Sequence, residues 1–134
     1  MMDLGLVVAK FNRSVTEEME EKAEEKAEEL EFDGVEKLRV PGSYDTVLAA
    51  DRLARKEEID AVTVVGAIVE GDTHHDRVIA DATAKSLQDV SRERDKPVTL
   101  GITGPSMSGA EARERTDYGA NAVEAAAEML EELE

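Results

Sequence analysis

The chain has 134 residues and no cysteine, and its 32 Asp and Glu residues outnumber its 16 Lys and Arg residues, for a formal net charge of −16. This length suits one domain with one core, here residues 1–134. The acid excess argues against nucleic acid and anionic membrane surfaces as partners, because both need clustered cations, and the lack of cysteine excludes disulfides and thiolate nucleophiles.

The acidic composition does not indicate disorder, because 41% of the residues are hydrophobic and they fall in periodic blocks. We expect the carboxylates to cover the outer surface, as in halophile-type proteins that stay soluble in concentrated salt and lose stability in dilute salt. No apolar run reaches the ~18 residues of a membrane-spanning helix, and the first residues lack the basic segment of a signal peptide. The expected location is the cytoplasm.

Strand and helix patterns alternate along the chain. A first strand at 4–10 precedes a helix for which Ser14 and Glu17 have the spacing of a capping box. Further strands are predicted at 35–40, 61–69 and 97–103, and further helices at 44–56 (with Ser43 as its cap), 74–94, 110–115 and 121–133. The run 61–69 has no polar face, which indicates the middle of a parallel sheet.

This order predicts an α/β fold, a three-layer flavodoxin-like sandwich with a mainly parallel four-stranded sheet. Ligands of such sheets bind at the carboxyl ends of the strands. The segments expected there are 11–12, 41–45, 70–76 and the residues from 100 onward.

The two histidines of the chain, His74 and His75, directly follow the central predicted strand. A histidine at a helix start is more often a solvated surface residue. This position, and the ability of imidazole to give and take protons near neutral pH, favour a role in proton transfer. Adjacent residues diverge by about 100° around a helix, so only one of the pair is expected to face the site.

A metal site is not expected, although Asp72, Asp76 and both histidines are potential ligands. Their spacing matches no known ligand pattern, and no further histidine or cysteine exists to complete a zinc site. The turn 71–73 before a helix resembles an anion-binding turn, with a simple helix cap by Asp72 or Thr73 as the alternative. Walker A and GxGxxG motifs are absent, so nucleotide cofactors have no support.

Three other side chains have both a structural and a functional interpretation. Phe11, at the end of the first strand, and Tyr44, after Pro41 and Gly42, either fill the core or stack on a flat heterocycle. Arg115 either forms a surface ion pair or clamps a phosphate or carboxylate.

Taken in order, these segments resemble the 6,7-dimethyl-8-ribityllumazine synthase family. Residues 10–12 (KFN) resemble R-F-N, residues 40–45 (VPGSYD) with 48–50 (LAA) resemble V-P-G-[AS]-[FY]-E with L-A-A, and residues 66–75 (GAIVEGDTHH) resemble G-x-V-I-x-G-x-T-x-H. Residues 97–101 (PVTLG), 114–115 (ER) and 119–121 (GAN) resemble P-V-x-F-G, E-R and G-N. The resemblance spans nearly the whole chain, and its third stretch is the most specific.

The resemblance implies the condensation of 5-amino-6-(D-ribitylamino)uracil with 3,4-dihydroxy-2-butanone 4-phosphate, which yields the lumazine, phosphate and water without cofactor or metal. It assigns the proton shuttle to His75, which Glu114 would tune. It also implies a homo-oligomer, a pentamer or an icosahedral shell of pentamers, with active sites built between neighbours.

The residues that the resemblance implies in substrate binding share positions at strand ends or in the loops that follow. They are Phe11 for stacking on the pyrimidine; Ser43, Tyr44 and Asp45 for the ribityl chain and ring edge; Ala67, Ile68 and Val69 for backbone contacts to the uracil; Asp72 and Thr73 for the butanone phosphate; Leu100 for an apolar wall where the family has Phe; and Arg115 for the phosphate.

Two other interpretations stay open from the sequence. An archaeal riboflavin synthase resembles this family but dismutates two lumazines, and the T-x-H motif favours the enzyme that makes lumazine. The second interpretation is a non-catalytic protein, either a flavodoxin-like binding module or a shell protein. The presence of both His75 and Arg115 argues against a shell protein that has lost catalysis. A receiver domain would need a Lys after the fourth strand, and that segment has none.

Overall fold

The computed structural model describes residues 2–71 and 75–134. Strands and helices alternate in the predicted order. The elements are β1 (Asp3–Ala9), α1 (Arg13–Glu29), β2 (Gly34–Val40), the short 3₁₀ helix η1 (Ser43–Asp45), α2 (Thr46–Ala54), β3 (Ala61–Ala67), α3 (His75–Arg94), β4 (Val98–Thr103), α4 (Gly109–Glu114) and α5 (Tyr118–Glu132).

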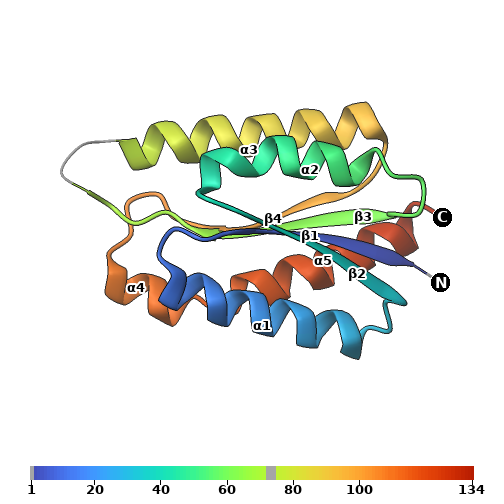
Figure 1. Cartoon of the computed structure of the whole chain (residues 1–134), viewed down its shortest axis with the longest axis horizontal. Coiled ribbons are helices and arrows are strands. Elements are labelled where there is room, and N and C mark those ends of the chain that lie inside the picture. The colour runs from blue at the N-terminus through green and yellow to red at the C-terminus, as the bar shows by residue number, and fades with distance from the viewer. Residues whose placement is uncertain (1, 72–74) are drawn as a thin grey trace.

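The four strands form one parallel sheet in the order β2-β1-β3-β4. Helices α2 and α3 cover one face of this sheet, and α1, α4 and α5 cover the other (Figure 1). The predicted three-layer α/β sandwich is thereby confirmed. All strands run in one direction, so their carboxyl ends lie together, at the opposite end of the molecule from both chain termini (Figure 1).

The core follows from the two-residue period of a strand that is covered on both faces. In β1, Leu6 and Val8 belong to the same buried cluster as Met19 of α1, whereas Val7 belongs to the cluster of Leu53 in α2. Every residue of β3 is buried, as the unbroken apolar pattern of this strand predicts. Within the described residues, no helix has both the length and the apolarity needed to cross a membrane.

The start of α1 differs from the prediction. The helix begins at Arg13, and its N-cap is Asn12 in the left-handed region with φ 63°, so the capping box predicted at Ser14 is wrong. The reason is a tertiary contact: the Asn12 side-chain amide donates to the carbonyl oxygen of Ala67 at 2.9 Å. That bond fixes the turn directly after β1 and starts the helix earlier.

Other boundaries also differ from the sequence prediction, including the start of α5 at Tyr118 rather than at Asn121. The predicted helix 44–56 is split into η1 and α2, because the Asp45 carboxylate accepts from the backbone N–H of Gly42 at 3.0 Å and closes a tight turn first. The predicted cap by Ser43 is therefore wrong: Ser43 is the first residue of η1, and the N-cap of α2 is Asp45. Strand β3 ends at Ala67, which leaves Ile68 and Val69 in the following loop.

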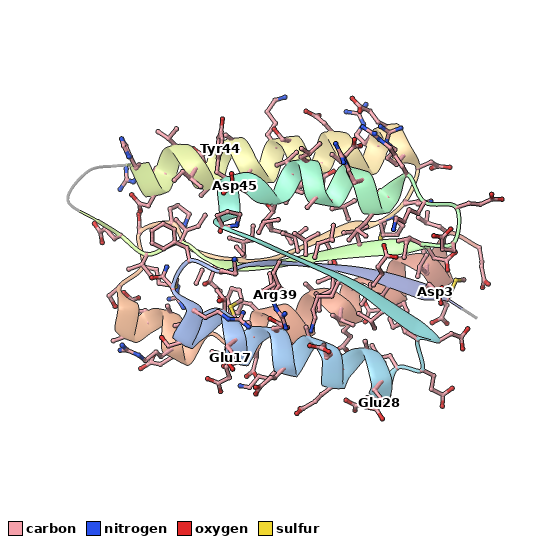
Figure 2. The ribbon with its side chains drawn as sticks, in the orientation of Figure 1. Asp3, Glu17, Glu28, Arg39, Tyr44 and Asp45 are labelled. Atoms are coloured by element: carbon pink, nitrogen blue, oxygen red, sulfur yellow. The ribbon has the colours of Figure 1, made fainter. Side chains whose placement is uncertain are left out.

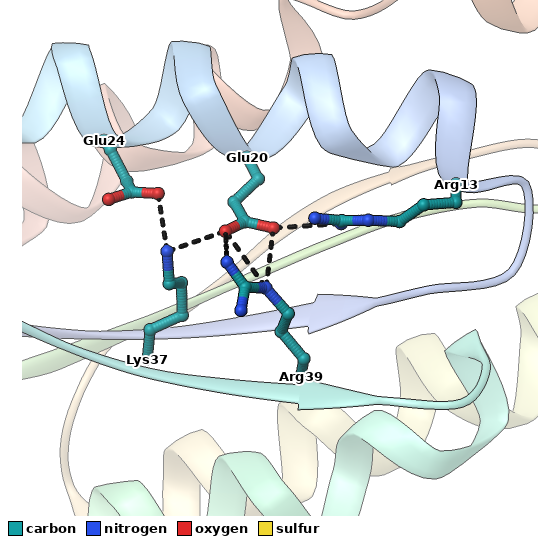
Figure 3. Close-up of polar contacts among 5 residues, drawn as sticks. All are labelled: Arg13, Glu20, Glu24, Lys37 and Arg39. Atoms are coloured by element: carbon teal, nitrogen blue, oxygen red, sulfur yellow. Dashed lines mark hydrogen bonds and ion pairs between the residues drawn. The ribbon is translucent and has the colours of Figure 1, made fainter.

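A buried carboxylate fastens α1 to the outer strand β2. Glu20 of α1 accepts hydrogen bonds from Arg13 at 2.9 Å, and from Lys37 and Arg39 of β2 at 2.7 Å each (Figure 3). Lys37 also donates to Glu24 at 2.8 Å. The Glu20 side chain is only 4% exposed, so these cations neutralise a charge that burial alone would destabilise.

The ionisation of Glu20 reflects this environment. Burial by itself raises the pKa of the Glu20 carboxyl, but the hydrogen bonds from Arg39, Lys37 and Arg13 outweigh it and lower the pKa to about 2. The carboxylate is therefore charged throughout the neutral range. The charged Glu20 side chain thus joins α1 to β2 at the edge of the sheet.

Candidate functional site

A cleft of about 490 Å³ opens at the carboxyl ends of β1, β2 and β3. Its walls come from segments far apart in the sequence, which the parallel sheet brings to one edge. They are Phe11 and Asn12 after β1, residues 41–45 after β2, residues 67–69 and Gly71 at the end of β3, and His75, Asp76 and Ile79 of α3.

Most of the residues that the sequence places in a binding site line this one cleft. They are Phe11, Ser43, Tyr44, Asp45, Ala67, Ile68, Val69 and His75. The predictions for Asp72, Thr73 and His74 lie outside the described residues. Leu100 and Arg115 do not line this cleft.

Two aromatic side chains stand at the cleft in contact with solvent. Phe11 is 73% exposed and Tyr44 is 67% exposed, so neither fills the core. Figure 2 shows Tyr44 beside Asp45, where the chain enters α2. The backbone N–H of Phe11 donates to the carbonyl of Pro41 at 2.9 Å, which joins the ends of β1 and β2. An exposed aromatic ring on a fixed backbone is suited to stacking on a flat ligand.

The floor of the cleft is built by close packing of small residues. Ser43 is 7% exposed. A side chain at Gly66 would place its Cβ 2.7 Å from the Ser43 hydroxyl, so β3 needs glycine there for η1 to approach. The apolar walls contributed by residues 67–69 then lie directly beside the polar residues of η1.

Asn12 lies in the segment 11–12 that the sequence places at the strand ends, but the sequence predicts no role for its side chain. Its amide holds the Ala67 carbonyl, and this bond joins the ends of β1 and β3 across the cleft floor. Asparagine tolerates the left-handed conformation better than other non-glycine residues. An Asn directly after a predicted strand is therefore the sequence signal that could have indicated this left-handed turn.

His75 and Asp76 form the α3 side of the cleft. His75 is exposed in the first turn of the helix, whereas Asp76 is 5% exposed and accepts from the backbone N–H of Ser106 at 2.8 Å. This hydrogen bond is the main cause of a lowered pKa for the Asp76 carboxyl. The sequence places Asp76 in the strand-end segment 70–76, with metal binding as the only candidate role for its side chain. Among the residues that the structure describes, no three acidic or histidine side chains are grouped to hold a metal.

Leu100 and Arg115 lie elsewhere on the same chain. Leu100 is on the outer strand β4, is 50% exposed, and borders a separate groove of about 540 Å³ with Tyr118 and Met129. Arg115 follows α4, and its guanidinium lies 3.4 Å from the Glu111 carboxylate with 39% of the side chain exposed. A partly exposed i,i+4 pair of this kind holds its cation weakly.

The fold and cleft define an α/β protein with a cleft at the carboxyl edge of a parallel sheet, which is where such folds bind small ligands. The family model for 6,7-dimethyl-8-ribityllumazine synthase matches residues 1–134. The chain belongs to this family, which places it among the transferases of riboflavin biosynthesis.

Three relatives illustrate the similarity, and each is named 6,7-dimethyl-8-ribityllumazine synthase. The chain is 62% identical to the protein of Halobacterium salinarum over 133 residues, which cover 99% of this chain and 100% of the relative. It is 60% identical to that of Halorubrum lacusprofundi, with both chains fully covered. It is 46% identical to that of Methanocaldococcus jannaschii, with 99% of this chain and 94% of the relative covered.

Proposed function

We propose that this cleft condenses 5-amino-6-(D-ribitylamino)uracil with 3,4-dihydroxy-2-butanone 4-phosphate in the cytoplasm, with His75 as the proton shuttle. The observation that carries the proposal is the meeting of an exposed aromatic ring, an apolar strand end and a histidine at one cleft. The reaction needs neither a cofactor nor a metal.

The cleft has complementary places for the parts of the pyrimidine substrate. The uracil ring stacks on Phe11 and takes its edge contacts from the backbone of 67–69. The ribityl chain runs toward the polar residues of η1, where the Asp45 carboxylate and the Tyr44 hydroxyl lie at the exposed rim. This arrangement holds the amino group of the substrate on the side of α3, where His75 lies. Positioning of this kind supplies much of the rate in a condensation.

The chemistry at His75 consists of proton transfers. The substrate amine adds to the ketone and loses water to form an imine. Removal of the proton from the hydroxyl-bearing carbon then expels phosphate from the next carbon and leaves an enol, which tautomerises to a ketone. The second amine adds to this ketone and loses a second water, which closes the ring. An imidazole that takes the carbon proton and returns a proton to the departing hydroxyl serves each step, and general acid–base catalysis contributes about 10²–10⁴-fold.

The phosphate of the second substrate needs a cation that the described part of this cleft does not contain. We propose that Arg115 of a neighbouring subunit supplies it and that Leu100 of that neighbour covers the pyrimidine. The exposed Leu100, Tyr118 and Met129 give the β4 edge an apolar face, which fits a subunit contact. The assembly is a homo-pentamer, either free or within a shell of pentamers.

The proposed reaction is tested by mixing the protein with both substrates in molar KCl. Lumazine absorbance and phosphate release are followed together, and both are expected to appear in equal amounts. Riboflavin formed from lumazine alone would identify a dismutating riboflavin synthase instead. Neither signal, from folded and assembled protein, would leave only a binding or shell function.

The acid excess leads to a prediction about salt. With a net charge of −16, repulsion within and between subunits is expected to lower the melting temperature and dissociate the oligomer in dilute buffer. Thermal melting and analytical sedimentation in dilute buffer and in molar KCl measure both effects. Identical behaviour in the two solutions would contradict the role given to surface charge.

A further inference from the structure

Asp76 is a buried carboxylate at the cleft that the proposed reaction does not use. It lies in the first turn of α3, directly after His75, and is 5% exposed. One oxygen accepts from the backbone N–H of Ser106 at 2.8 Å, and the other is buried without a hydrogen-bond partner among the described residues. A buried carboxylate needs hydrogen-bond partners, and the Ser106 N–H is a partner from outside α3.

The partner of Asp76 belongs to the segment that follows β4. This segment runs beside the loop after β3: Ile68 donates to the carbonyl of Thr103 at 2.8 Å, and Glu70 donates to that of Met107 at 2.7 Å. Met107 is fully buried in the core cluster below α1 and α5. Segment 103–107 is thus anchored to the strand-end wall at two points.

Asp76 supplies the third anchor, and it is the one that reaches α3. Ser106 adopts a left-handed conformation with φ 59°, which is unfavourable for serine and directs its N–H to the carboxylate. The Asp76–Ser106 hydrogen bond therefore sets the distance between the first turn of α3, which bears His75, and the strand-end wall formed by Ile68 and Val69.

We propose that Asp76 is a positioning residue for the reaction: its bond to Ser106 holds the first turn of α3, and with it His75, against the strand-end wall where the pyrimidine lies. The role rests on the function proposed for His75. Catalysis by a positioned group is sensitive to small displacements, whereas binding along the rest of the cleft is less so. Loss of the bond thus lowers kcat more than it raises the KM for the pyrimidine.

The test compares Asp76→Ala, which removes the acceptor, with Asp76→Asn, which retains an oxygen for the Ser106 N–H. Asp81→Asn is the matched control, because it removes one negative charge from an exposed position on the same helix. We expect Asp76→Ala to lower kcat about tenfold with little change in KM, and to speed hydrogen exchange in segment 103–107. Asp76→Asn is expected to keep kcat and the exchange of segment 103–107 close to the wild-type values. Asp81→Asn is expected to change neither kcat nor exchange.

Exchange and turnover separate this role from the proposed function. Unchanged exchange in Asp76→Ala overturns the anchor, and faster exchange with unchanged kcat overturns the positioning role. An inactive wild type overturns the reaction, and the positioning role with it, while the exchange data still report on the anchor. If Asp76→Ala does not fold, Asp76→Glu replaces it, because this variant moves the acceptor by one methylene. It is expected to lower kcat and to speed hydrogen exchange by smaller amounts. Wild-type values of kcat and of exchange in Asp76→Glu overturn the proposal.

Discussion

Replacing His75 with alanine is expected to slow lumazine formation by about 100-fold or more, because the condensation loses its general acid and base. The fold is expected to stay intact, since His75 is exposed and substitutions at exposed positions usually change stability little. Steady-state rates of phosphate release, with melting temperature and sedimentation measured on the same samples, separate the two effects.

His74→Ala is the control for this experiment, because it removes the same side chain from the neighbouring position. The proposed shuttle is His75, so His74→Ala is expected to change the rate less than threefold, a difference of about 0.6 kcal/mol in activation free energy. Equal losses in the two variants would contradict the assignment of the shuttle to His75.

Replacing Glu20 with glutamine is expected to lower the free energy of unfolding by about 2 kcal/mol at neutral pH. A pKa lowered from 4.5 to about 2 corresponds to roughly 3 kcal/mol of stabilisation of the charged form. The net effect is smaller because Arg39 and Arg13 are 48% and 37% exposed and are therefore partly screened. Denaturant unfolding of both proteins at constant KCl measures the difference.

The pH dependence of this difference has a definite sign. The folded pKa of Glu20 lies below the unfolded value, so the carboxylate stabilises the fold fully above pH 4.5 and loses that effect as the pH falls toward 2. The gap between wild type and Glu20→Gln is expected to close over that range. Glu24→Gln is the control, because Glu24 is 43% exposed and contacts only Lys37 of this cluster. Equal effects at the two positions would show that burial of Glu20 is not decisive.

The layers of the fold and its parallel four-stranded sheet were predictable from sequence, whereas local boundaries were not. The apolar run from Ala61 onward identified the central strand because burial on both faces leaves no polar period. The start of α1 was predicted two residues late, because the Asn12–Ala67 bond that fixes it joins positions far apart in sequence. Local capping patterns do not contain that information.

The candidate site was predictable to a similar degree. Phe11, Tyr44 and His75 come together because parallel strands bring their carboxyl ends to one edge, a rule that needs only the order of elements. Asp76 was expected at the strand ends, but its contact with Ser106 was not predictable, because that contact depends on burial and joins positions 30 residues apart. The position of Arg115 away from the cleft was also not predictable, because sequence patterns do not give distances between residues.

The proposed active site uses His75 of one subunit and Arg115 of its neighbour. Each single variant, His75→Ala or Arg115→Ala, is expected to form inactive or severely impaired oligomers. Co-expression of the two variants produces mixed oligomers in which some clefts have both native residues. With random mixing these are about a quarter of all clefts, because each native residue is present with a probability of about one half.

Activity of such mixed oligomers, purified through a different tag on each variant, is the most direct measurement. We expect about a quarter of the wild-type rate per subunit. The control mixes His75→Ala with Phe11→Ala, two changes in the cleft of one chain, and is expected to restore nothing. A mixture of His75→Ala and Arg115→Ala that is no more active than its parents would contradict a site shared between subunits.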